Sequence, residues 1–239
     1  MMKRFKILKW DTNLFGYNVA QMNADNNFAL EPEALRRSLI KDSIKLLYIF
    51  IELPNNLVQN NIEAAGAFKV DEKVLYHKTV KNNTVDDITP DIEPYNSCSV
   101  NDNLLSLTFQ SGIYSRFYTD KNFKNNEFAR LYTIWIERSV KKEIADEVLV
   151  YAVSGREYGM ITLKVDKNIG IIGLFAVDGQ MRGRSIGKKL IVAAEKYFSD
   201  RGIKEIEVTT QNANITACKF YESREFKVKN IKNVYHFWL

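Results

Sequence analysis

A short run of glycines and cations is the first sign of chemistry in this chain of 239 residues. Residues 177–188 (VDGQMRGRSIGK) contain Gly183 and Gly187, and we expect a helix to begin at about Ser185. Glycines let the backbone approach a ligand, and a helix start offers unpaired N–H groups and the positive end of the helix dipole. The run also carries three cations, namely Arg182, Arg184 and Lys188. These features fit a pyrophosphate site, although spacing alone leaves open a mere tight turn.

The elements around this run predict a mixed sheet with helices on its faces. Three apolar segments joined by short turns precede it and indicate an antiparallel meander: residues 147–153, 158–165 and 169–177. After the run we expect a helix (185–198), a strand (204–210), a helix (214–223) and two strands (226–231 and 234–239). The order β-β-β-α-β-α-β-β predicts an α+β fold with a mostly antiparallel sheet flanked by helices.

The first third of the chain predicts a smaller set of elements. These are a helix from Pro32 that carries Leu35, Leu39, Ile40 and Ile44, a buried strand at 46–53, a helix at 56–65 ended by Gly66, and a hairpin of 68–70 with 74–80. Residues 81–99 lack any period and contain Pro90 and Pro94, which indicates a linker. An amphipathic helix follows at 128–140. We therefore divide the chain into an N-terminal domain (1–85), a linker (86–100) and a second domain (101–239).

The two domains share a faint repeat. Three blocks of the first, at 56–57, 68–70 and 76–77, match blocks of the second at 214–215, 226–228 and 235–236. The first copy lacks the glycine-containing loop, and it has Glu63 where the second copy has Tyr221. If the repeat is real, the N-terminal domain is a partial copy and the chemistry resides in the second domain.

Composition excludes several kinds of protein. The net charge of +5 is spread along the chain without a long basic run, so nucleic-acid binding is not suggested. Two cysteines and two histidines are too few for a zinc site without help from carboxylates, and we predict no metal. We expect no signal peptide, and the longest strongly apolar run, 169–177, is too short to cross a bilayer. These features predict a cytoplasmic protein with no membrane partner.

Two motifs resemble those of the GCN5-related N-acetyltransferase superfamily. The pattern QxxGxS at 180–185 is similar to motif A, with Ser185 where the family usually has Gly or Ala, and NxxAxxFY at 214–221 is similar to the next motif. In that family motif A binds the pyrophosphate of coenzyme A, so the resemblance implies acetyl-CoA as co-substrate. The cofactor-binding residues that it implies are Leu174, Phe175, Ala176, Val177, Gln180, Met181, Arg182, Gly183, Arg184, Ser185, Ile186, Gly187, Lys188 and Asn214.

The resemblance also assigns catalytic roles to Tyr221 and Asn214. In many members the tyrosine protonates the departing thiolate, and the asparagine holds the cofactor or that tyrosine. A phenol of pKa near 10 stays protonated at pH 7, whereas a thiol of pKa near 8.5 leaves as thiolate, so Tyr221 is suited to be the acid. The alternative is that Phe220 and Tyr221 pack in the core. Backbone N–H groups near Val177 are expected to polarise the thioester carbonyl.

Other reactive side chains are weaker candidates. Cys218 has no evident histidine partner, so we expect a structural role rather than an acyl-carrying nucleophile. Glu207 and His236 are candidates for a base that deprotonates the acceptor amine. The alternative is that Glu207 is a solvated strand residue and His236 a packed histidine. Deprotonating the amine costs only about 1.4–3 kcal/mol when its pKa lies one or two units above neutral, so no dedicated base is required.

Further short motifs resemble the TDP-fucosamine acetyltransferase group, at 10–16, 115–117, 131–136 and 235–239. That resemblance implies N-acetylation of a nucleotide-linked amino sugar, a TDP-4-amino-4,6-dideoxyhexose, for surface polysaccharide synthesis. It also implies a partial acetyltransferase-like domain before the catalytic one. A peptide N-terminus, a polyamine or an aminoglycoside as acceptor stays open, as does a non-catalytic coenzyme A-binding module. Trp10, Phe15 and Arg116 are candidates for the acceptor site or for core and dimer contacts, which leaves a homodimer open.

Overall fold

The computed structural model describes residues 5–24, 32–52, 56–80 and 91–239. Its strands form one open sheet of ten strands in the order β1-β2-β3-β10-β4-β9-β8-β7-β6-β5. The strands are β1 (Lys6–Ile7), β2 (Asn18–Ala24), β3 (Ile44–Glu52), β4 (Phe68–Thr79), β5 (Ile92–Pro94), β6 (Glu147–Val153), β7 (Arg156–Asp166), β8 (Ile169–Val177), β9 (Glu205–Gln211) and β10 (Lys227–Trp238). The helices are α1 (Lys9–Phe15), α2 (Pro32–Lys41), α3 (Asn56–Ala64), α4 (Asp102–Gly112), α5 (Arg116–Thr119), α6 (Glu127–Val140), the 3-10 turn η1 (Gly179–Met181), α7 (Ile186–Ser199) and α8 (Ile215–Ser223).

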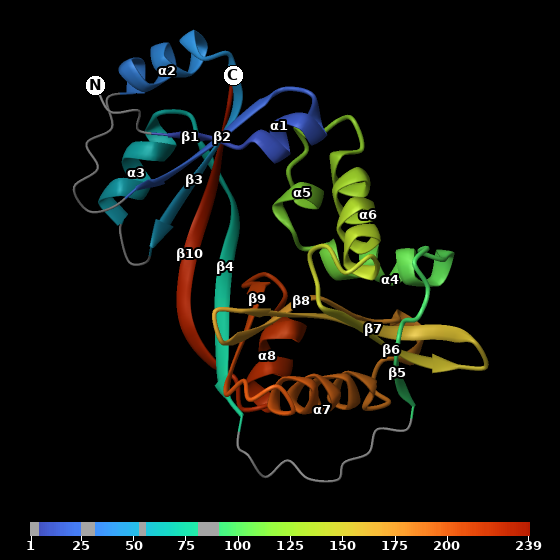
Figure 1. Cartoon of the computed structure of the whole chain (residues 1–239). Helices are drawn as coiled ribbons and strands as arrows, with labels where there is room; N and C mark the ends of the chain where they lie inside the picture. Colours follow the sequence, from blue (N-terminus) through green and yellow to red (C-terminus); the bar gives the residue numbers. More distant parts are fainter. Residues whose placement is uncertain (1–4, 25–31, 53–55, 81–90) are drawn as a thin grey trace.

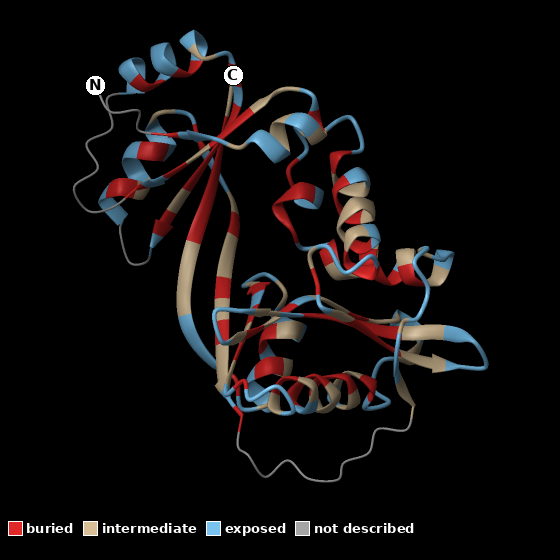
Figure 2. Cartoon of the chain, in the orientation of Figure 1, coloured by how far each residue is buried: buried red, intermediate tan, exposed pale blue. Residues whose placement is uncertain are grey.

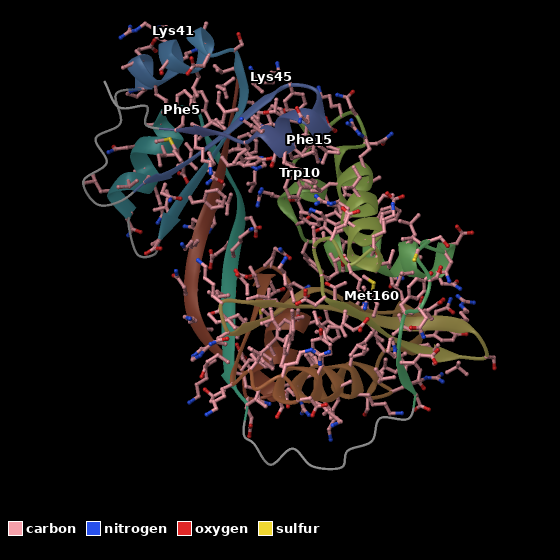
Figure 3. The ribbon with its side chains drawn as sticks, viewed as in Figure 1. Phe5, Trp10, Phe15, Lys41, Lys45 and Met160 are labelled. Atoms are coloured by element: carbon pink, nitrogen blue, oxygen red, sulfur yellow. The ribbon has the colours of Figure 1, made fainter. Side chains whose placement is uncertain are left out.

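The second half of the chain has the predicted architecture. Strands β6, β7 and β8 form the antiparallel meander, and β9 joins β8 in parallel after α7. Helices α7 and α8 cover one face of this part of the sheet, and α4 with α6 cover the other (Figure 1). Met160 of β7 is buried beneath α4 with Leu104 and Leu107 (Figure 3). The predicted α+β fold with a mostly antiparallel sheet flanked by helices is therefore confirmed.

Two predicted pairs of strands are instead single long strands. The segment expected to form a hairpin at 68–80 is the continuous strand β4, and the last two expected strands are the continuous strand β10. Each is longer than expected because it pairs with both halves of the sheet: β10 lies between β3 and β4, and β4 lies between β10 and β9 (Figure 1). Burial follows this path, since β10 is exposed near Lys227 and buried from Val234 to Phe237 (Figure 2).

Other boundaries differ in smaller ways. Helix α2 ends at Lys41, and Ile44, expected in that helix, begins β3. Within the expected linker, Ile92–Pro94 forms an edge strand on β6, whereas residues 86–90 lie outside the described residues. Helix α4 was not predicted, although the Asn101 side chain caps it by accepting the Leu104 N–H at 2.9 Å. In the described residues, no helix is long and apolar enough to cross a membrane.

The faint sequence repeat coincides with a repeat of connectivity. The order β2-α2-β3-α3-β4 recurs as β8-α7-β9-α8-β10, and the first and second strands of each set, β2 with β3 and β8 with β9, are parallel neighbours. In the middle of the sheet the order is β3-β10-β4-β9. The last strand of the first copy, β4, thus pairs with β9 of the second, and the last strand of the second copy, β10, pairs with β3 of the first. The two halves are thus joined by exchanged strands.

The two copies differ in how far their first two strands stay paired. Strands β2 and β3 stay paired as far as Ala24 and Ile51. Pairing between β8 and β9 stops at Ile172 and Val208, so the end of β8 separates from its neighbour. This leaves a gap in the sheet directly before the glycine-containing loop.

Candidate active site

The loop after β8 is held by local backbone contacts. The Asp178 side chain accepts the N–H of Gln180 at 2.9 Å and starts the turn η1. The chain then passes through two residues with left-handed backbone, Gly183 (φ +77°) and Ser185 (φ +58°), before α7 begins. Left-handed backbone suits glycine and strains other residues, so the position of Ser185 favours glycine on conformational grounds alone.

This loop borders a cavity of about 490 Å³, here called the loop cavity. The predicted cofactor-binding residues that line it are Phe175, Ala176, Val177, Met181, Arg182, Gly183, Ser185, Ile186, Gly187, Lys188 and Asn214. Of the others, Leu174 lines a second cavity, and Gln180 and Arg184 line neither. Gln110 and Ser111 of helix α4 complete the wall with Ile113 and Tyr114, which follow the helix; the sequence reasoning missed these residues because it did not find this helix.

The loop cavity is suited to an anion. Arg182, Lys188 and Arg224 line it, and among the described residues no Asp or Glu does. The first N–H groups of α7 have no partner within the helix, and the Ser185 side chain makes no cap hydrogen bond with them. A side chain at Gly187 would press on Phe220, since a Cβ there would lie 3.2 Å from its ring, whereas glycine leaves the helix start open. The residues present therefore fit a pyrophosphate-bearing ligand.

The free edge of β8 adds backbone donors. Leu174 donates its N–H to the Thr162 hydroxyl at 2.8 Å, and Asp178 donates to the Tyr158 carbonyl at 2.8 Å, both toward β7. Because successive N–H groups of a strand point to opposite sides, those of Phe175 and Val177 point toward the gap left by β9. Donors in this position can polarise a carbonyl bound in the gap.

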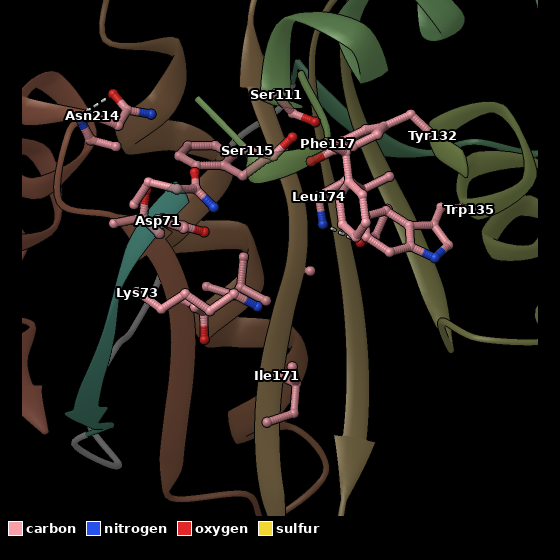
Figure 4. A pocket seen from close by; sticks show the side chains of 18 of the residues that line it. Asp71, Lys73, Ser111, Ser115, Phe117, Tyr132, Trp135, Ile171, Leu174 and Asn214 are labelled. Atoms are coloured by element: carbon pink, nitrogen blue, oxygen red, sulfur yellow. Dashed lines mark hydrogen bonds between the residues drawn. The ribbon is translucent and has the colours of Figure 1, made fainter. Parts of the chain in front are cut away.

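A second cavity of about 430 Å³, here called the central cavity, lies at the gap between the two halves. Asp71 and Lys73 extend into it from β4, opposite the aromatic side chains of Phe117, Tyr132 and Trp135 (Figure 4). Arg116 is its third charged residue, and Tyr221 also lines it. The two cavities share four lining residues, namely Ser111, Phe175, Asn214 and Ala217. The two cavities therefore lie next to each other at these residues.

Helix α8 contributes both predicted catalytic residues to this junction. Tyr221 is 4% exposed and lines the central cavity. Burial, followed by the neighbouring Cys218, raises the pKa of Tyr221 well above its usual value. Asn214 caps the helix by accepting the Ala217 N–H at 3.2 Å and lines both cavities. Its side-chain oxygen thus fixes the start of the helix that carries Tyr221.

Asp71 is the only carboxylate among the residues that line the central cavity in the described structure. It is 8% exposed, and burial raises its pKa to about 6 in spite of the opposing charges of Lys73 and Arg116. Burial and the charge of Arg116 lower the pKa of Lys73 to about 8. A carboxylate of pKa near neutrality can accept a proton from an amine at physiological pH. The sequence reasoning missed both residues, because it took this segment for a hairpin.

Neither predicted base lies at the central cavity. Glu207 forms an ion pair with Lys229 at 2.6 Å on another part of β9. His236 is fully buried and its Nδ1 lies 2.6 Å from Asp120 Oδ2, while burial lowers its pKa to about 4. His236 is thus a packed histidine.

The other acceptor-site candidates separate in the structure. Arg116 lines the central cavity. Phe15 is 4% exposed and packs in an aromatic cluster with Tyr48 and Phe117, so it belongs to the core. Trp10, on the same helix (Figure 3), lines a separate surface hollow. Among the described residues, no group of three or more His, Cys, Asp or Glu is placed to hold a metal ion.

Residues 109–226 match the acetyltransferase (GNAT) family. This segment contains the loop, the gap in the sheet and α8. A curated relative, an uncharacterised N-acetyltransferase of Methanocaldococcus jannaschii, is 26% identical over 160 residues. The similar part covers 64% of this chain and 62% of the relative's length.

Solved structures agree in fold across nearly the whole chain. A GCN5-related N-acetyltransferase from Sphaerobacter thermophilus has a TM-score of 0.58 at 15% identity, over 98% of this chain and 76% of that one. A conserved protein of unknown function from Staphylococcus epidermidis has a TM-score of 0.63 at 14% identity, over 99% and 91%. A tandem GNAT protein from the clavulanic acid biosynthesis pathway has a TM-score of 0.55 at 12% identity, over 92% and 75%. Residues 109–226 of this chain therefore match the acetyltransferase (GNAT) family in sequence, and the chain shares the fold of these solved structures.

Proposed function

We propose that this chain transfers the acetyl group of acetyl-CoA to the amine of a small acceptor by direct attack. The observation that carries the proposal is that the two cavities are adjacent and share the lining residues Ser111, Phe175, Asn214 and Ala217. The loop cavity has the cations and helix N–H groups for a pyrophosphate, and the central cavity has room for an acceptor. Acetyl-CoA supplies the thioester that is cleaved.

Two side chains suit the proton transfers of this reaction. The amine nitrogen forms a bond to the acetyl carbon as the carbon–sulfur bond breaks. Asp71 accepts the proton that the amine loses, and Tyr221 donates a proton to the leaving thiolate. The N–H groups of Phe175 and Val177 stabilise the charge on the carbonyl oxygen. In this scheme Asn214 positions Tyr221 through the helix cap.

The acceptor that we propose is a nucleotide-linked amino sugar, a TDP-4-amino-4,6-dideoxyhexose. Support comes from the charges of the central cavity, where Lys73 and Arg116 outnumber the one carboxylate, Asp71. A cavity with excess positive charge favours an anionic acceptor over a polyamine or an aminoglycoside. The aromatic wall formed by Tyr132 and Trp135 offers a surface for a base or sugar ring.

Three further parts of the account rest on the sequence. We propose that residues 1–85 are a partial acetyltransferase-like domain and residues 101–239 the catalytic domain, with 86–100 between them. The repeated order of strands and helices supports this division. A role in surface polysaccharide synthesis in the cytoplasm, and a homodimer, stay predictions.

Thiol release from acetyl-CoA tests the function directly. The panel contains TDP-4-amino-4,6-dideoxygalactose, the free amino sugar, a peptide with a free N-terminus, spermidine and an aminoglycoside. We expect the nucleotide sugar to be turned over with the highest kcat/KM. Turnover of spermidine or the peptide alone would retain acetyl transfer and refute the acceptor class. If coenzyme A binds but no amine releases thiol, the chain is a coenzyme A-binding module instead.

A further inference from the structure

Arg116 is a buried cation that forms no ion pair with any described carboxylate. It is 8% exposed, and its guanidinium carbon lies 4.6 Å from the Tyr48 ring and 4.4 Å from the Phe117 ring. Its Nε is enclosed and has no hydrogen-bond partner among the described residues. No described carboxylate forms an ion pair with it, although the charges of Asp11 and Asp71 act on it from further away. A buried charge left unpaired is strongly destabilising.

Ser115 has the same property. It is 4% exposed, and its enclosed hydroxyl meets no full hydrogen-bond geometry in the described structure, although it lies close enough to Tyr132 to oppose the rise in the pKa of that phenol. Both residues line the central cavity, where Ser115 lies near Phe117 and across from Asp71 (Figure 4). Two adjacent buried donors that the protein does not satisfy indicate that something else in the cavity satisfies them.

The chemistry of these donors selects the ligand. A guanidinium offers a planar fork of N–H groups that matches the two oxygens of a carboxylate or phosphate, and a hydroxyl adds a third donor. Contact with the Tyr48 and Phe117 rings restricts the movement of the guanidinium. We propose that Arg116 and Ser115 form a subsite for an oxyanion, a phosphate or carboxylate of the amine acceptor; this inference rests on the proposed function of the same cavity.

Calorimetric titration of the full chain, saturated with coenzyme A, tests the subsite without turnover. Thymidine diphosphate is compared with thymidine for the phosphate, and glucuronate with glucose for the carboxylate. We expect the anionic member of one pair to bind at least about tenfold more tightly, which also identifies the oxyanion. If neither anion binds more tightly than its neutral partner, the proposal is overturned.

Variants connect this binding to Arg116. Arg116→Lys keeps the charge without the fork, so we expect the anion to bind about tenfold more weakly. Arg116→Met removes the charge and should abolish the preference for the anion. The matched control is Arg138→Gln on α6, whose partner is the exposed Glu143, and it should bind as the wild type does. Anion binding at wild-type strength in Arg116→Lys refutes the assignment, even if Arg116→Met does not fold.

Stability gives a second readout. A residue kept for a ligand should cost stability when that ligand is absent, so Arg116→Met should melt at or above the wild-type temperature. A large fall in melting temperature would mean that Arg116 is structural.

The oxyanion subsite and the proposed function can be refuted independently of each other. Arg116-dependent anion binding without thiol release refutes only the function, and rapid acetylation of neutral amines that is unchanged in Arg116→Lys refutes only the subsite.

Discussion

The Thr162 hydroxyl accepts the backbone N–H of Leu174 at 2.8 Å and thereby fixes the point where the sheet opens. Between the pairs Ile161–Phe175 and Leu163–Ile172, strand β8 has one residue more than β7. This bulge turns β8 away from β9 just where their pairing ends. The Thr162 hydroxyl therefore accepts the hydrogen bond that a backbone carbonyl of β7 would accept in a regular strand pair. The gap that is proposed to receive both substrates begins at this bond.

Replacing Thr162 by valine should destabilise the protein and weaken cofactor binding together. The change keeps the side-chain shape but leaves the Leu174 N–H without its acceptor, at a cost of about 1–3 kcal/mol. Urea unfolding and titration with coenzyme A measure the two effects. The control Thr79→Val removes a hydrogen bond to Glu205 at an exposed strand end and should leave coenzyme A binding unchanged. Equal coenzyme A affinity in both variants would refute the role given to this bulge.

Replacing Ser185 by glycine should stabilise the chain by about 1 kcal/mol and preserve coenzyme A binding. Ser185 has a left-handed backbone (φ +58°), which glycine adopts without strain. The Ser185 side chain makes no cap hydrogen bond that would be lost. Ser185→Ala is the matched control and should give no gain, because alanine keeps the strain. Chemical denaturation of the three proteins measures the difference, and a glycine variant no more stable than the alanine variant contradicts the explanation.

Asp71→Asn should change how stability depends on pH. Burial raises the pKa of folded Asp71 to about 6 from 3.8, so the stability that this carboxyl contributes is fully present below pH 3.8 and is lost as the pH rises through 6. Asp71→Asn has no carboxyl to ionise, so its free energy of unfolding does not fall in this way. Relative to the wild type it should gain up to about 3 kcal/mol between pH 4 and pH 8, measured by urea unfolding. The exposed Asp200→Asn should show no such gain, and an equal response would contradict the burial argument.

The same carboxyl should control the acidic side of the rate profile. If Asp71 accepts the amine proton, kcat/KM of the wild type should fall about tenfold per unit below pH 6, where Asp71 becomes protonated. Asp71→Asn should be slower at pH 8, by about 10²-fold, and should lack this inflection. Acetyl-CoA affinity should be unchanged, because Asp71 does not line the loop cavity. A variant that keeps the wild-type inflection would assign the base to another group.

Local sequence signals predicted the loop and the helices that form one half of the candidate site. The loop with Gly183 and Gly187 and the helix that follows it occupy one short stretch, so their residue types indicate both the turn and the anion. The cap that Asn214 makes on α8 is also a contact within four residues. Such features depend on neighbours in the chain and can be recognised without knowledge of the sheet.

The acceptor half could not be predicted in the same way. The run Asp71-Glu72-Lys73 interrupts an apolar pattern, which indicates a turn. The run instead lies inside β4, where polar side chains are accommodated because Asp71 and Lys73 line the central cavity. Arg116 reaches the same cavity from α5, which is far away in sequence. These residues meet only because β4 and β10 exchange places between the two halves, a pairing that no local pattern of hydrophobic residues specifies.

Tyr221→Phe tests the central claim most directly, with thiol release and coenzyme A affinity measured on the same samples. Because burial raises its pKa, Tyr221 stays protonated throughout the working pH range and can donate to the thiolate. The account predicts unchanged coenzyme A affinity and a kcat lower by about 10²-fold or more. Tyr76→Phe is the matched control, since that ring packs 5.7 Å from Tyr221 but lines neither cavity. A Tyr221→Phe enzyme that turns over at the wild-type rate would contradict acetyl transfer at this junction with Tyr221 as the acid.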